Sequence, residues 1–113
     1  MAKVVDTKIL DIEMMRGDTL KFAVEIKNLA GTVNAVSFGC RASATATNYV
    51  FQKTLNNGIT VGSDGKYTVR VAPEDTATKS AGWYDYDLEF TIGNDVYTPM
   101  SGKLHLMQDV TYV

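Results

Sequence analysis

The fold is decided by residues 73–90, which read PEDTATKSAGWYDYDLEF. From residue 83 onward the stretch alternates, with aromatic or aliphatic residues at every second position: Tyr84, Tyr86, Leu88, Phe90 and Ile92. Trp83, Asp85, Asp87, Glu89 and Thr91 fall between them. Because successive side chains of a strand point to opposite faces, this pattern predicts one long strand with a buried face and a solvated face. Such a strand is typical of an antiparallel sheet that is packed on one side.

A short helical turn is expected just before this strand, over residues 73–79. Pro73 lacks the N–H group that a first helical turn does not need, and Glu74 and Asp75 suit the positive end of a helix dipole. The turn leads into a Gly-x-Tyr-x-Tyr sequence at 82–86. Immunoglobulin-like sandwiches cross between their two sheets in this way, with a tyrosine at the corner. We therefore expect an all-β, immunoglobulin-like antiparallel β-sandwich.

The rest of the chain supports a domain of many short strands. Period-2 patterns and β-rich runs predict strands near 7–15, 20–27, 36–43, 49–54, 59–61, 67–71, 82–92, 96–100 and 103–106. Turn sequences separate them at 16–18, 56–58, 63–65 and 93–95. Pro99 is expected at an edge or a bulge, and the tail 109–113 is expected to add a further strand pair. Eight or nine strands in one domain, 1–113, fit a sandwich, with an open barrel as the alternative.

Composition and charge argue against two classes of partner, nucleic acids and membranes. The chain has 113 residues, a formal charge of −2 and both signs interspersed. No basic stripe exists to neutralise phosphates, so nucleic acid is not expected as a partner. No apolar run approaches the roughly 20 residues of a membrane span, so membrane insertion is not expected either. The first residues do not resemble a signal peptide, and a single cysteine is compatible with a reducing cytoplasm, so secretion is not expected.

The sequence offers little for catalysis or metal binding. Cys40 is in phase with Val36 and Phe38 and should point into the core, whereas His105 alternates with Leu104 and Leu106 and should face solvent. The only thiol and the only imidazole are thus expected on opposite sides of their sheets, which argues against a Cys–His pair. One cysteine and one histidine are too few for a closed zinc site. We expect no catalytic, metal-binding or cofactor-binding residue, and no enzyme activity.

Four residues are the best candidates for contact with a partner. Trp83 is a large aromatic residue on the face expected to be wet, where it can anchor a partner or stack on a sugar. Asp85 and Asp87 share that face, and His105 is expected to be exposed on the last strand. An exposed aromatic pair flanking a shallow groove, such as Trp83 with Tyr97, would favour a glycan ligand.

The order and spacing of several motifs resemble a known family. These are MRGDTLKF at 15–22, GITV at 58–61 with DGKYTV at 64–69, PEDTA at 73–77 with GWYDYDL at 82–88, and GKL at 102–104 with DVT at 109–111. Together they resemble the small immunoglobulin-like domains of tailed bacteriophages and prophages, above all the N-terminal domain of baseplate upper proteins. The resemblance covers nearly the whole chain, but its motif positions are turns and core, so no functional residues carry over.

The resemblance implies a structural module of a virion. The expected function is non-enzymatic assembly in a tail, a baseplate or a fibre attachment, through contacts with other virion proteins. The resemblance also implies self-assembly into a homo-oligomer, a trimer or a hexamer. It further implies synthesis in the bacterial cytoplasm and a location in the virion. The alternative function is a β-sandwich module that binds a glycan or another cell-surface ligand.

Overall fold

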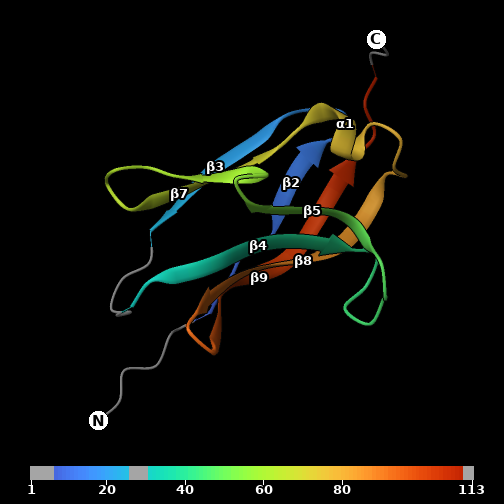
Figure 1. The fold of residues 1–113 in the computed structure, drawn as a ribbon. Helices are drawn as coiled ribbons and strands as arrows, with labels where there is room; N and C mark the ends of the chain where they lie inside the picture. Colours follow the sequence, from blue (N-terminus) through green and yellow to red (C-terminus); the bar gives the residue numbers. More distant parts are fainter. Residues whose placement is uncertain (1–6, 26–30, 111–113) are drawn as a thin grey trace.

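The computed structural model describes residues 7–25 and 31–110 (Figure 1). The strands in these ranges are β1 (Lys8–Ile9), β2 (Ile12–Met15), β3 (Leu20–Glu25), β4 (Val33–Arg41), β5 (Tyr49–Leu55), β6 (Gly58–Val61), β7 (Lys66–Val71), β8 (Gly82–Ile92) and β9 (Asp95–Met107). One helical turn, α1 (Pro73–Thr76), stands between β7 and β8. The all-β prediction with a single helical turn near 73–79 is confirmed.

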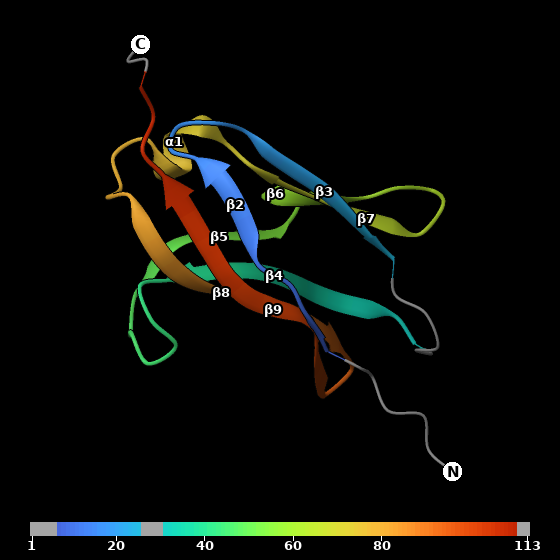
Figure 2. The same cartoon turned by 180° about the vertical axis from the view of Figure 1, so that it is seen from behind.

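The strands form one curled sheet in the order β1-β9-β8-β4-β5-β6-β7-β3, with β2 also paired to β9. Most pairs are antiparallel, but β1 and β2 run parallel to β9, and β5 runs parallel to β6. The curl lays β3, β6 and β7 over β4, β8 and β9, which gives the two layers of a sandwich (Figures 1 and 2). Ring contacts join the layers, since Phe22 of β3 lies 5.4 Å from Phe38 of β4 and Tyr67 of β7 lies 5.0 Å from Phe90 of β8.

The core follows the alternation of β8. Tyr86, Leu88 and Phe90 are buried, whereas Trp83 on the other face is 57% exposed. Aliphatic and aromatic residues from the facing strands complete the core: Ile12, Met14, Val36, Phe38, Phe51, Ile59, Val69, Val71, Leu104 and Leu106. The face assignment predicted for this strand is therefore confirmed.

The corner before β8 is held by polar contacts. The Asp75 carboxylate accepts a hydrogen bond from the backbone N–H of Ala72 at 2.7 Å and forms an ion pair with Lys53 at 2.6 Å. Thr76 is fully buried, and its hydroxyl oxygen accepts a hydrogen bond from the N–H of Gly17. The Tyr84 hydroxyl donates to the carbonyl of Ser80, four residues upstream. This contact is the expected tyrosine corner.

The first predicted strand, 7–15, differs from the structure. It is divided into β1 and β2, and the Leu10 side chain between them is 41% exposed instead of buried. The Leu10 N–H donates to the carbonyl of Ser101, and its carbonyl accepts from the Tyr86 hydroxyl. Gly102 permits this crossing, because a Cβ there would lie 2.3 Å from the Leu10 carbonyl oxygen. These backbone contacts turn Leu10 away from the core.

The two strands predicted over 96–106 are one strand, β9, with a bulge. Leu88 faces Met100 and Phe90 faces Tyr97, so Thr98 and Pro99 together stand opposite Glu89. Proline has no N–H to give to a ladder, which suits it to a bulge, as predicted. The extra residue also reverses the alternation of side chains along β9. Most of the predicted tail strand, residues 111–113, lies outside the described residues, and residues 108–110 form no strand.

Candidate binding surface

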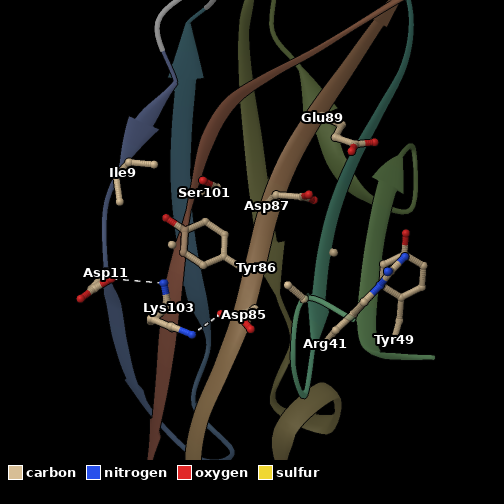
Figure 3. Close-up of a pocket in the computed structure, with 13 residues that line it drawn as sticks. Ile9, Asp11, Arg41, Tyr49, Asp85, Tyr86, Asp87, Glu89, Ser101 and Lys103 are labelled. Atoms are coloured by element: carbon tan, nitrogen blue, oxygen red, sulfur yellow. Dashed lines mark hydrogen bonds and ion pairs between the residues drawn. The ribbon is translucent and has the colours of Figure 1, made fainter. Parts of the chain in front are cut away.

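The outer faces of β5, β4, β8 and β9 carry an open pocket of about 490 Å³, which we call the outer-face groove (Figure 3). It is lined by Ile9, Asp11, Gly39, Arg41, Ala44, Tyr49, Asp85, Tyr86, Asp87, Glu89, Ser101, Gly102 and Lys103. The cross-strand register explains the gathering, because Arg41 and Lys103 both stand opposite Asp85 on the two strands that flank β8. The polar face of β8 therefore becomes the floor of a groove that two neighbouring strands enclose.

One side of the outer-face groove is neutralised internally. The Lys103 ammonium lies 2.6 Å from the Asp85 carboxylate, and the Lys103 backbone N–H donates to Asp11 at 3.2 Å (Figure 3). Asp85 is thereby engaged in a pair with a half-exposed lysine. Such an ion pair near solvent contributes little to stability. A charged ligand can therefore replace either Lys103 or Asp85 as the partner of the other at little cost in stability.

The middle of the groove carries acceptors without protein partners. Within residues 7–25 and 31–110, no hydrogen bond or ion pair reaches the carboxylates of Asp87 or Glu89. Both side chains are half-buried. Burial raises the pKa of Asp87, and the nearby Arg41 guanidinium acts in the opposite direction. A half-buried carboxylate without a partner favours a ligand that donates hydrogen bonds or carries a positive charge.

An aromatic wall closes the opposite side of the groove. The Tyr49 ring covers Gly39 so closely that a Cβ at residue 39 would lie 2.5 Å from it. The Arg41 guanidinium carbon lies 4.5 Å from the Tyr49 ring centroid, within the range of a cation–π contact. This stack presents a flat cationic group beside the carboxylates of β8.

A second aromatic stack lies next to the groove, two residues along β8 from Asp85. Trp83 and His105 stand opposite each other, with ring centroids 4.2 Å apart and planes within 8°. Glu13 of β2 lies 3.7 Å from His105 Nδ1. We call Trp83 and His105 the Trp–His stack. Trp83 keeps 57% of its surface exposed, although one ring face is covered.

The four predicted contact residues thus share one face of the molecule. Asp85 and Asp87 line the outer-face groove, and Trp83 and His105 form the stack beside it. Whether these residues touch a partner stays a prediction. Side-chain periodicity did not point to Arg41, Tyr49 or Lys103, which lie on other strands and reach the groove through strand pairing. Charged and aromatic residues at the ends of neighbouring predicted strands were the only signal for them.

The aromatic pair suggested for a glycan ligand does not form. Tyr97 stands opposite the fully buried Phe90, which places it on the inner face, whereas Trp83 is on the outer face. The bulge at Thr98 and Pro99 is the reason, because it reverses the side-chain alternation between Tyr97 and His105. The feature that would have favoured a glycan ligand is therefore absent at these two residues.

Cys40 points into the core and His105 outward, as predicted. Cys40 is fully buried between β5 and β8, and burial, with Asp85 nearby, raises the pKa of its thiol to about 12. In the part of the chain that the structure describes, no three His, Cys, Asp or Glu residues are grouped to hold a metal ion. Among these same residues, no helical segment has the length and hydropathy of a membrane span.

Comparison with known proteins adds evidence on the fold. No family model and no curated protein matches the chain. Among solved structures, the natural killer cell receptor NKp44, a triggering partner in natural cytotoxicity, matches with a TM-score of 0.52 at 16% identity, covering 91% of this chain and 100% of that one. The extracellular domain of the voltage-gated sodium channel β4 subunit, whose parallel homodimers explain its role in cell–cell adhesion, gives a TM-score of 0.48 at 13% identity, over 97% and 100%. The fold is immunoglobulin-like.

The match to NKp44 corrects the expected function. A structural role in a virion tail, baseplate or fibre attachment was expected, with other virion proteins as partners. NKp44 is instead a cell receptor and not a virion protein. The motifs that carried the phage resemblance are turn and core positions, which any immunoglobulin-like sandwich needs. They therefore specify the fold and not its use in a virion.

Proposed function

We propose that this domain is a non-catalytic recognition module for a cell-surface protein, and that it binds through the outer-face groove and the Trp–His stack. The observation that carries the proposal is the pair of half-buried carboxylates, Asp87 and Glu89, to which no described residue donates a hydrogen bond and with which none forms an ion pair. A lysine or arginine of the partner protein would supply the missing charge-assisted hydrogen bonds. The groove would then select a basic segment.

The residue types around the groove support a protein ligand. Tryptophan, tyrosine and arginine are the residues that dominate binding energy at protein interfaces. Tyr49 and Arg41 line the groove together with the carboxylates, and Trp83 lies beside the groove in the Trp–His stack. The Trp83 ring is oriented before binding by its stack with His105, and the Tyr49 ring by its contact with Arg41. This orientation lowers the conformational entropy that is lost when a ligand orders the two rings. Such a surface is suited to recognition.

A glycan is the second candidate ligand. Trp83 retains an exposed aromatic surface, and the groove offers carboxylates together with the Ser101 side chain beside Asp87. Sugars are recognised by aromatic stacking combined with polar groups of this kind. The absent Trp83–Tyr97 pair weakens this candidate, because a single exposed ring covers less of an extended sugar chain.

The test is a screen of the tetramerised domain against an array of extracellular protein domains and against a glycan array. The proposal expects binding to a protein that carries an exposed basic segment. Asp87→Asn combined with Glu89→Gln should lower the affinity about tenfold or more, since charge-assisted hydrogen bonds are lost. The matched control is Glu74→Gln in α1, outside the groove. Binding to glycans only, or protein binding that the groove variants leave unchanged, would contradict the proposal.

A further inference from the structure

The strand β3 ends the sheet with an open edge. It pairs with β7 on one side, and the sheet order stops there. Across residues 7–25 and 31–110, no strand pairs with its other side (Figure 2). An edge strand directs every second pair of backbone N–H and C=O groups outward, and these groups form a template for another strand. The opposite end of the sheet is formed by two very short strands, β1 and β2, which both pair with the same edge of β9.

The inner side of β3 is incompletely covered. Leu20, Phe22 and Val24 point toward the core but are only half-buried, whereas Leu88 and Phe90 of β8 are fully buried. Phe22 contacts Phe38 edge-on and leaves part of its ring accessible. A strand paired with the open edge of β3 would extend the layer formed by β3, β6 and β7. Its own side chains would then bury more of the apolar surface of these three residues.

The outer side of β3 has an unbalanced charge. Lys21 stands opposite Arg70 of β7, and like charges directly opposite each other in a sheet are destabilising. No carboxylate pairs with Lys21 in the described ranges. A strand that brings an acidic side chain beside Lys21 would relieve this repulsion.

The sequence of β3, LKFAVE, supplies such a strand from a second copy of the chain. In an antiparallel pair with Ala23 opposite itself, Lys21 of each copy faces Glu25 of the other, and Phe22 faces Val24. We propose that the open edge of β3 is a self-association site, where two copies pair β3 with β3 around a two-fold axis at Ala23. Glu25 stands opposite Lys66 in its own chain and already has an interaction partner. A carboxylate offers about four acceptor positions, so Glu25 can accept from Lys21 of the second copy while it keeps its present contacts.

The pairing has the symmetry and size of a weak dimer. A two-fold axis makes the interface self-complementary, so both Lys21–Glu25 contacts form together. Only one six-residue strand from each copy takes part, which places the interface below the area of stable complexes. The dimer should therefore form only at high protein concentration. The outer-face groove lies on β4, β5, β8 and β9, so self-association leaves it open.

The test is a charge exchange measured by sedimentation equilibrium over a wide concentration range. The wild-type chain is expected to dimerise, and Lys21→Glu or Glu25→Lys alone should weaken the dimer about tenfold or more, because both contacts become like-charged. An equimolar mixture of the two variants should associate again as a heterodimer, since every contact is then of opposite charge. The double variant Lys21→Glu/Glu25→Lys should recover the homodimer.

Two controls separate this result from trivial ones. Asp95→Lys places the same charge change as Glu25→Lys on the exposed β8–β9 hairpin and should leave the dimer unchanged. Thermal unfolding should show that Lys21→Glu is folded and no less stable than wild type, because it removes the repulsion with Arg70. A wild-type chain that stays monomeric at all concentrations would overturn the proposal. So would a variant mixture that does not associate.

Discussion

The two faces of β8 differ in what holds their residues in place. On the inner face, Leu88 and Phe90 are fully buried in a core to which both layers contribute. On the outer face, Asp85, Asp87 and Glu89 are only half-buried, and one of the three has an ion-pair partner among the described residues. The inner face therefore stabilises the fold, whereas the outer face holds polar groups that the fold leaves unsatisfied. One strand thus carries the residues that stabilise the core on one side and polar residues open to solvent on the other.

The largest expected effect tests the inner face. Leu88→Ala removes a fully buried side chain and leaves a cavity, so the free energy of unfolding should fall by about 2–5 kcal/mol. Urea unfolding followed by circular dichroism measures this loss. Glu89→Ala, the next residue on the outer face, is the matched control and should change stability by about 0.5 kcal/mol or less. Similar losses for both variants would break the distinction between the faces.

A pH series tests the inner face by a different route. The pKa of the Cys40 thiol is raised to about 12 in the folded chain, and that of Tyr86 also to about 12, mainly by burial. As the pH rises above 9, the unfolded chain releases the thiol proton while the folded chain keeps it, so the free energy of unfolding decreases. Unfolding measured between pH 8 and 11 should show this decline, and Cys40→Ala should flatten its first part, before tyrosine begins to titrate at about pH 10. Parallel profiles for the two proteins would contradict the prediction.

The smallest expected effect belongs to the outer face. Trp83→Ala removes an exposed stack on His105 and should lower the free energy of unfolding by about 1 kcal/mol or less. His105→Ala removes the other half of the stack and should have a similarly small effect. Both are measured by thermal unfolding next to Leu88→Ala. A loss for Trp83→Ala as large as that for Leu88→Ala would show that the outer face also carries the fold.

The sequence predicted the inner face well because alternation is a local property. Along β8, the apolar residues at every second position are the ones that are buried. The same agreement between residue type and burial holds for Phe38 and Cys40 on β4. The path of the chain around Leu10 was not predictable in this way. There the side chain turns outward because its backbone is bonded to Ser101 and Tyr86, which are far away in sequence. A hydrophobic residue in phase with a core face is buried only if the backbone keeps that phase.

The candidate site was predictable only in part. The polar residues of β8 could be placed on one face, but the outer-face groove depends on which strands stand beside them. Arg41 and Tyr49 come from β4 and β5, and their stack needs Gly39 beneath the tyrosine ring. The inner-face position of Tyr97 was also not predictable, because it depends on the one extra residue that β9 has at its bulge. Strand pairing and bulges are long-range features, which side-chain periodicity does not contain.

The burial of Cys40 has a practical consequence for following motions of this domain. It is the only cysteine of the chain, it stands on β4 between β5 and β8, and its side chain is fully buried in the core. An alkylating reagent in solution reaches the sulfur only when the central strands separate. The rate of alkylation in native buffer therefore reports spontaneous openings of the core, without denaturant and without an engineered cysteine.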